Sequence, residues 1–184
     1  MERYIALLRG VNISGRNKIA MLELKMGFEK IGFLSVSTHL NSGNVVFEAE
    51  SDDKGRIADS IRAMIESKFG LKIPVFVMGK EELREILDNA PEWWGSGDKE
   101  IYDNLIFMLP PLSFDVLCGE LGEPNRELER VENYRNAVFW SFDRKQYQKT
   151  NWWAKTADCA ISEQITIRTA GTMQKLMAIC DKQK

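Results

Sequence analysis

The spacing of apolar positions changes several times within the first eighty residues. A short continuous apolar run comes first, and apolar residues then recur every three or four positions, as on one face of a helix. Later segments alternate apolar and polar residues, which is typical of a half-buried strand. In chain order, these patterns predict strand, helix, strand, strand, helix and strand over residues 4–9, 21–31, 36–40, 45–47, 57–69 and 73–78.

The second half of the chain repeats this rhythm less regularly. It predicts strands at 105–109, 128–131, 137–142 and 165–168, a helix at 113–121, and a closing helix with the apolar stripe Met173, Leu176, Met177 and Cys180. The pattern of residues 144–162 is only weakly helical. A helix at 81–89 and a loop at 91–99 that contains Gly, Ser and Asp lie between the halves, as linkers do.

The order strand-helix-strand-strand-helix-strand is that of the ferredoxin-like, split βαβ arrangement. A length of 184 residues allows two small domains. We therefore predict an α+β protein of two tandem ferredoxin-like units with antiparallel sheets and a C-terminal helix. The expected domains are residues 1–80, which carry a polar site, a linker at 81–102, and residues 103–184, which end in the closing helix.

Two short polar segments adjoin strands of the first predicted unit. They are Arg9-Gly10-Val11-Asn12 and Asn41-Ser42-Gly43-Asn44. Right-handed crossover makes the first two strands parallel, with the third strand between them and antiparallel to both. The loop after the first strand and the turn between the next two strands must then share one edge of the sheet. We therefore expect these segments to meet, although they are separated along the chain.

The residue types in these segments suit a small anionic or nucleotide-like ligand. An arginine offers a planar fork of donors, asparagine amides add donors, and glycine N–H groups near a helix start can form an anion nest. The predicted ligand-binding residues are Arg9, Gly10, Asn12, Lys18, Asn41, Ser42, Gly43 and Asn44. In the alternative interpretation, the same asparagines and glycines only form turns that hold two loops together. The loop lacks the GxxxxGK[ST] pattern of a Walker nucleotide site.

A second candidate anion site lies before the closing helix. Thr172 is positioned to cap that helix, and Arg168 can meet an anion at its start; the alternative is a cap with a local salt bridge. The pairs Trp93-Trp94 and Trp152-Trp153 can stack on bases, but we expect them to fill the seam between two domains, with one ring of each pair buried.

Composition excludes several other classes of site. Net charge is −2, which does not favour bulk attraction to nucleic acid or to an anionic membrane. The chain has one histidine, His39, so a zinc site with several histidines is impossible, and we expect neither metal nor cofactor. Three widely spaced cysteines, the absence of a signal-peptide pattern and the absence of a long apolar run predict a cytoplasmic protein.

The chain resembles the bacterial family called domain of unknown function 1697, which has no established activity. The segments that carry the resemblance are Tyr4 through Asn12, Lys18 and Thr38 through Phe47. A C-terminal Thr-x-Arg-Asn-Trp-Asn-Thr pattern is kept at Thr166, Arg168 and Thr172, whereas Thr169-Ala170-Gly171 departs from it. The resemblance extends along essentially the whole chain and implies tandem ferredoxin-like domains.

Three functions remain open from the sequence. The first is binding of a small anionic or nucleotide-like ligand at the polar segments. The second is binding of RNA or single-stranded nucleic acid on an open sheet face, which the acidic balance and the missing RNP aromatic signature disfavour. The third is a structural or partner-binding protein without a ligand. His39 can act as an acid or base beside the site, but no carboxylate pair stands out, so no catalytic residue is nominated.

Overall fold

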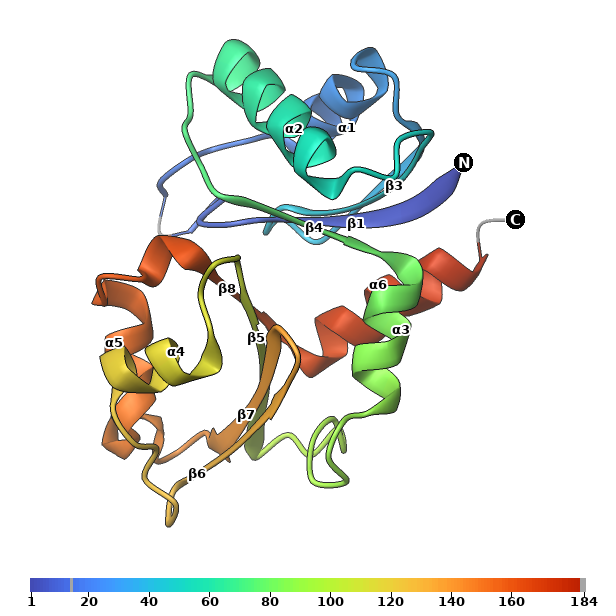
Figure 1. Cartoon of the computed structure of the whole chain (residues 1–184). Coiled ribbons are helices and arrows are strands. Elements are labelled where there is room, and N and C mark those ends of the chain that lie inside the picture. Colours follow the sequence, from blue (N-terminus) through green and yellow to red (C-terminus); the bar gives the residue numbers. More distant parts are fainter. Residues whose placement is uncertain (14, 183–184) are drawn as a thin grey trace. The chain divides into compact units, whose positions relative to one another are not determined.

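The computed structural model describes residues 1–13 and 15–182 (Figure 1). It is a mixed α+β chain with two four-stranded antiparallel sheets and a C-terminal helix. The chain divides into two compact units. Met1–Arg84 and the residues from Lys175 onward form the first unit, and Glu85–Gln174 form the second.

The first unit alternates strands and helices in the order predicted from the hydrophobic pattern. Its elements are β1 (Glu2–Leu8), α1 (Met21–Lys30), β2 (Leu34–His39), β3 (Asn44–Ala49), α2 (Lys54–Phe69) and β4 (Val75–Gly79). The strands lie in the order β2-β3-β1-β4, and every neighbouring pair is antiparallel. The central strands β1 and β3 therefore have a partner on both sides.

One face of this sheet is covered by α1 and α2 (Figure 1). Tyr4, Ala6 and Leu8 alternate along β1 and pack into that core, where the rings of Phe28 and Phe47 meet edge to face. Helix α2 begins where the Asp53 side chain accepts a hydrogen bond from the Arg56 N–H, which satisfies a free donor of the first turn. The apolar face of each helix thus closes the layer above the strands.

The second unit has the same element order with additional short helices. Its elements are β5 (Ile101–Met108), α4 (Phe114–Leu121), β6 (Glu129–Tyr134), β7 (Ala137–Asp143), two 3-10 turns (Tyr147–Lys149 and Ser162–Gln164), α5 (Asn151–Asp158) and β8 (Ile165–Thr169). The strand order is β6-β7-β5-β8, again with antiparallel neighbours. Helices α3 (Lys80–Asp88) and α6 (Ala170–Lys182) each contribute residues to both units.

Strand β6 is longer than the sequence pattern predicts. The pattern predicts a strand that ends at residue 131, whereas the structure continues β6 to Tyr134 and leaves a turn of only Arg135 and Asn136. Glu132 and Asn133 are exposed polar residues on the edge strand of the sheet. Their pairing with β7 therefore produces no alternation of apolar and polar residues from which the strand could be predicted.

The tryptophans pack within the second unit. Trp152 is fully buried in its core and donates from Nε1 to the Gly122 carbonyl oxygen at 2.8 Å. Trp94 is also buried and donates to the Asn104 carbonyl oxygen at 2.8 Å. One ring of each pair is therefore buried as expected, but the expectation that both pairs fill a domain seam is wrong for Trp152, which belongs to the core of one unit.

Candidate functional site

The two polar segments of the first unit meet, as the topology predicts. Leu7 of β1 lies opposite Asn44 of β3, and the Leu8 N–H donates to the Gly43 carbonyl oxygen at 2.8 Å. A Cβ placed on Gly43 would lie 2.7 Å from the Leu8 Cβ, which is closer than side chains pack. Gly43 has a φ of 71°, so glycine is suited to this turn both by conformation and by space.

Asn12 holds the loop after β1 against the turn after β2. Its Nδ2 donates to the carbonyl oxygens of Ile19 at 2.9 Å and Asn41 at 2.8 Å, and its Oδ1 accepts from the Ile19 N–H at 2.9 Å. Both amide protons and the amide oxygen are therefore used within the chain. The Asn12 amide acts as a clasp between the segments, which is the alternative that the sequence left open for it.

The turn itself is also closed by internal bonds. Asn44 is fully buried, and its Nδ2 donates to the His39 carbonyl oxygen at 3.0 Å and to the Ser42 Oγ at 2.9 Å. Asn41 is exposed and supplies the carbonyl oxygen that Asn12 binds. The Asn44 amide thus fixes the shape of the turn from inside, whereas the Asn41 side chain faces solvent.

An open hollow of about 530 Å³ lies on the loop after β1. Gly10, Ile13, Arg16 and Asn17 line it. The Asn17 Nδ2 donates to the Gly10 carbonyl oxygen at 3.1 Å, and the Asn12 N–H donates to the Asn17 carbonyl oxygen at 3.1 Å, so the loop folds back on itself. Of the predicted ligand-binding residues, Gly10 lies directly on this hollow.

Arg16 is the residue that the sequence analysis missed at this place. Arg16 and Lys18 are both exposed, and neither makes an ion pair within residues 1–13 and 15–182. Arg9 is half-buried, and its backbone N–H donates to the Pro74 carbonyl oxygen at 3.0 Å. A cation inside a glycine- and asparagine-rich loop is the sequence signal that identifies Arg16, because such loops leave side chains exposed on a fixed backbone.

His39 lies on β2 beside this turn and is half-buried. Burial lowers the pKa of the imidazole from its ordinary value of 6.5, and the nearby positive charge of Lys175 lowers it further. Both effects disfavour the imidazolium. At neutral pH, His39 therefore stays a neutral hydrogen-bonding group and adds no positive charge to the site.

The second candidate site is organised by local hydrogen bonds. Helix α6 begins at Ala170, and the Thr169 hydroxyl accepts from the Thr172 N–H at 3.4 Å, so Thr169 and not Thr172 is the cap. The Thr172 hydroxyl lies 3.0 Å from the Thr169 hydroxyl. The Arg168 Nη1 donates to the Thr166 Oγ1 at 3.1 Å and to the Ile167 carbonyl oxygen at 2.8 Å. The proximity of Arg168 and Thr172 to the helix start fits a cap with local bonds.

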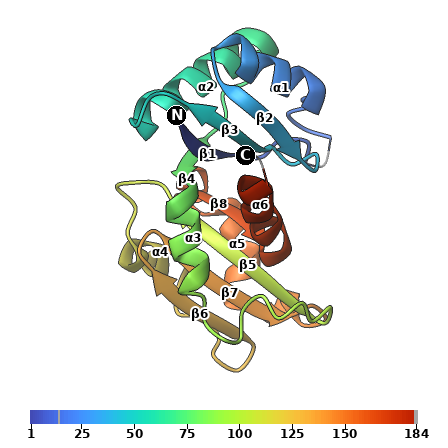
Figure 2. The same cartoon turned by 90° about the vertical axis from the view of Figure 1, so that its right-hand side faces the viewer.

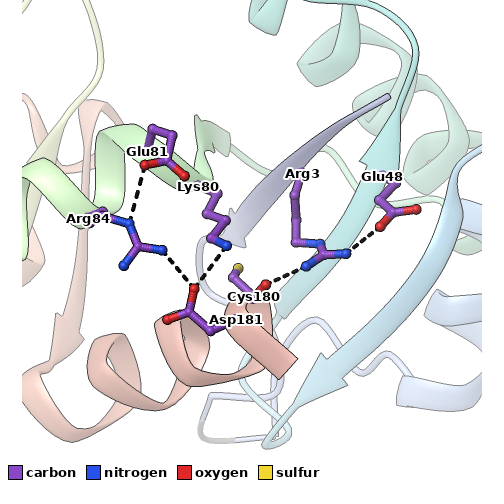
Figure 3. Close-up of polar contacts among 7 residues, drawn as sticks. All are labelled: Arg3, Glu48, Lys80, Glu81, Arg84, Cys180 and Asp181. Carbon is purple, nitrogen blue, oxygen red and sulfur yellow. Dashed lines mark hydrogen bonds and ion pairs between the residues drawn. The ribbon is translucent and has the colours of Figure 1, made fainter. Parts of the chain in front are cut away.

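A charged network within the first unit was not visible in the sequence (Figure 3). Asp181 of α6 accepts from Lys80 at 2.9 Å and from Arg84 at 2.7 Å, and these two bonds hold the pKa of its carboxyl below the ordinary value. Arg3 of β1 donates to the Glu48 carboxylate at 2.5 Å and to the Cys180 carbonyl oxygen. The network ties the end of α6 to β1 and to the start of α3.

The Cys180 thiol next to this network is not a reactive group. It is fully buried, and burial raises its pKa to about 11. A thiol with a raised pKa is a poor nucleophile at neutral pH, because the thiolate is the reactive form. The thiol is unreactive and the charges around it are paired. We therefore interpret the network as a structural contact among α6, β1 and α3.

Two general features limit the chemistry of the chain. Within residues 1–13 and 15–182, no three His, Cys, Asp or Glu side chains come together as metal ligands. In the same described part, none of the helices has the length and the apolar character needed to cross a bilayer.

Comparison with known proteins finds a family whose description gives no function. The profile of the family described as "Protein of unknown function (DUF1697)" matches residues 1–139. The C-terminal Thr166–Thr172 pattern lies beyond this matched range, so the match is shorter than the resemblance suggested. Among curated proteins, no similar sequence is found.

A solved structure shares the fold of nearly the whole chain. It is that of the conserved bacterial protein SP0830 from Streptococcus pneumoniae, which is 25% identical and superposes with a TM-score of 0.83. The superposition covers 97% of this chain and 98% of that one. The similarity supports a shared fold for the two proteins.

Proposed function

The chain belongs to the DUF1697 family, whose description gives no activity, and from the geometry of the first unit we propose that it binds a small anion at the loop between β1 and α1. The observation that carries this proposal is the hollow lined by Gly10, Ile13, Arg16 and Asn17, with an exposed arginine that has no ion-pair partner within the described residues. The guanidinium fork suits a phosphate or carboxylate group.

The size of the hollow fits a small ligand. About 530 Å³ lies within the range of small-molecule sites, roughly 300–1,000 Å³. Lys18 follows Arg16 in the same loop and is exposed, so it supplies a second positive charge close by. Ile13 is 58% exposed at the rim and offers apolar contact to a ring or chain attached to the anion.

The asparagine clasp supports binding indirectly. Asn12 joins the start of this loop to its end through two hydrogen bonds with Ile19, so these two residues are held together before a ligand arrives. Ordering that is already present in the free protein does not reduce affinity. In this proposal Asn12 and Asn44 shape the site, while Arg16, Lys18 and the backbone near Gly10 contact the ligand.

Thermal unfolding with and without anions tests the proposal. Phosphate or citrate, compared with chloride at equal ionic strength, is expected to raise the melting temperature, because a ligand bound only by the native state stabilises it. Arg16→Ala is expected to remove the increase. Lys30→Ala is the matched control, since Lys30 is an exposed cation outside the loop. An equal increase in all variants, or no increase in the native chain, would refute binding at this loop.

The fold of each unit also has a proposed assignment. In both units the order βαββαβ and the strand order, edge to edge, second-third-first-fourth are those of the ferredoxin-like arrangement, so we infer two tandem units of that kind. We retain residues 1–80 and 103–184, joined by a linker at 81–102, as the proposed domains. The free thiols of Cys118, Cys159 and Cys180 support the proposal of a cytoplasmic, reducing compartment.

A further inference from the structure

Strand β6 forms one edge of the second sheet (Figure 2). It pairs with β7 over six consecutive residues, from Glu129 opposite Phe142 to Tyr134 opposite Ala137, without a shift in register. A regular edge strand presents a row of backbone donors and acceptors to which another strand can pair.

The outward row of β6 can be assigned from its hydrogen bonds. In an antiparallel pair, alternate residues direct their N–H and C=O groups toward the partner strand and away from it. The Glu129 N–H donates to the Asn125 carbonyl oxygen, which is not on β7, so Glu129 belongs to the outward set. By alternation, Val131 and Asn133 also direct their backbone groups away from β7.

The equivalent edge of the first unit carries an irregularity that β6 lacks. Strand β2 occupies the same place in its sheet, but its register with β3 shifts between Leu34 and Ser37, and Ser35 has a φ of 50°. Such an irregularity twists an edge away from foreign strands. The two units thus share one topology, and only β2 of these two edges carries the protective distortion.

The space beside β6 is open within the second unit. A hollow of about 610 Å³ lies between α4 and β6, and its lining includes Phe114 and Cys118 of the helix and Arg130, Val131 and Glu132 of the strand. Val131, at the centre of the strand, therefore borders open space within this unit, and Trp93 also lines this hollow.

The charged side chains of β6 are complementary to those of a second β6 strand that runs in the opposite direction. If two copies of β6 pair antiparallel with Val131 opposite Val131, Arg130 of each copy lies opposite Glu132 of the other. Arg130 and Glu132 are both exposed, lie on the same face of the strand, and make no ion pair within the described part of the chain. Directly opposite residues of unlike charge stabilise a strand pair, and like charges oppose it.

We propose that β6 pairs with β6 of a second copy of this chain, antiparallel and centred on Val131, so that two Arg130–Glu132 ion pairs form across a twofold axis. The same surface patch serves both copies, as a twofold interface requires. The Val131 N–H and C=O groups exchange hydrogen bonds at the centre. The two four-stranded sheets of the second units then continue into one sheet of both copies.

Sedimentation equilibrium of the whole chain tests this pairing through charge reversal. The native chain is expected to associate reversibly into dimers. Arg130→Glu places Glu opposite Glu132, and Glu132→Arg places Arg opposite Arg130, so each variant alone is expected to associate at least tenfold more weakly. An equimolar mixture of the two variants restores both unlike pairs and is expected to regain the native association. Glu163→Arg, an exposed reversal in the turn that precedes β8, is the control and should dimerise normally.

The mixture distinguishes pairing from damage to the fold. A misfolded variant cannot regain association when mixed with another, whereas a complementary pair can. A native chain that stays monomeric at every soluble concentration would overturn the proposal. Dimers that survive both reversals, or a mixture no stronger than its components, would overturn it equally, because the contact between copies would then lie elsewhere.

Discussion

The side-chain Nδ2 of Asn12 donates a hydrogen bond of 2.8 Å to the backbone carbonyl oxygen of Asn41, 29 residues further along the chain. This bond joins the loop after β1 to the turn after β2 at one edge of the first sheet. With a φ of 55°, Asn12 also adopts a left-handed conformation that asparagine tolerates better than most residues. The Asn12 amide thus contributes to both the position and the shape of the loop beside Arg16.

Replacing Asn12 should destabilise the first unit. Asn12→Ala removes three hydrogen bonds, leaves the Ile19 N–H without its acceptor and strains the backbone, so the expected cost is about 2–4 kcal/mol. Asn12→Gly relieves the backbone strain and should recover about 1 kcal/mol of this loss. Urea denaturation measures both values. A cost for Asn12→Ala within about 0.5 kcal/mol of zero would contradict the clasp.

Glycine at position 43 should be required by space as well as by conformation. A Cβ there lies 2.7 Å from the Leu8 Cβ and 3.1 Å from the Leu8 oxygen, so Gly43→Ala is expected to cost about 2–4 kcal/mol. Gly15 has a similar φ of 77° but no neighbour within 4 Å, so Gly15→Ala should cost only about 1–2 kcal/mol. Equal costs in a denaturation experiment would show that crowding at Leu8 is unimportant.

Glu129 is expected to hold the second unit together as a carboxylate. It is 3% exposed and accepts from the Asn125 N–H at 2.9 Å, the Asn151 N–H at 2.7 Å and the Trp140 Nε1 at 2.9 Å. Glu129→Gln turns an NH₂ group toward at least one of these donors and should cost about 2–3 kcal/mol. Glu127→Gln, an exposed position in the same segment, should change the unfolding free energy by less than about 0.5 kcal/mol.

Sequence patterns were sufficient for features that follow from periodicity and topology. The order of elements in the first unit and the meeting of Leu8 with Gly43 required only the periodicity of apolar residues and the handedness of crossovers. The patterns were insufficient where several residues of one type compete. Thr169 and Thr172 are both able to cap a helix, and only the actual start of α6 at Ala170 selects Thr169.

Side-chain hydrogen bonds were the least predictable part of the site. The sequence around a loop asparagine looks the same whether its amide binds a ligand or a backbone carbonyl. The sequence therefore did not distinguish the structural bonds of Asn12 from contacts to a ligand. The bond between Arg3 and the Cys180 carbonyl oxygen joins residues 177 positions apart. No local pattern encodes such a contact, because it exists only after the last helix has packed.

The Arg3–Glu48 pair should make stability depend on pH in the acidic range. Hydrogen bonds from Arg3 and then Ser35 lower the pKa of the Glu48 carboxyl from its ordinary value of 4.5. The folded state therefore binds this proton less readily than the unfolded state, so the pair stabilises the protein above about pH 4.5 and loses its effect as pH falls through the lowered pKa. The difference in unfolding free energy between the native chain and Glu48→Gln should shrink across this window. A difference that stays constant with pH would contradict the assignment.

The most direct test of anion binding is a two-dimensional ¹H–¹⁵N NMR titration of the native chain with phosphate at constant ionic strength. The expected result is a saturable shift of the amide signals of Gly10, Ile13, Arg16 and Asn17, with the signals of the second unit unchanged and with the shifts absent in Arg16→Ala. Saturable shifts confined to other residues, or no saturable shift in the native chain, would contradict the proposed site.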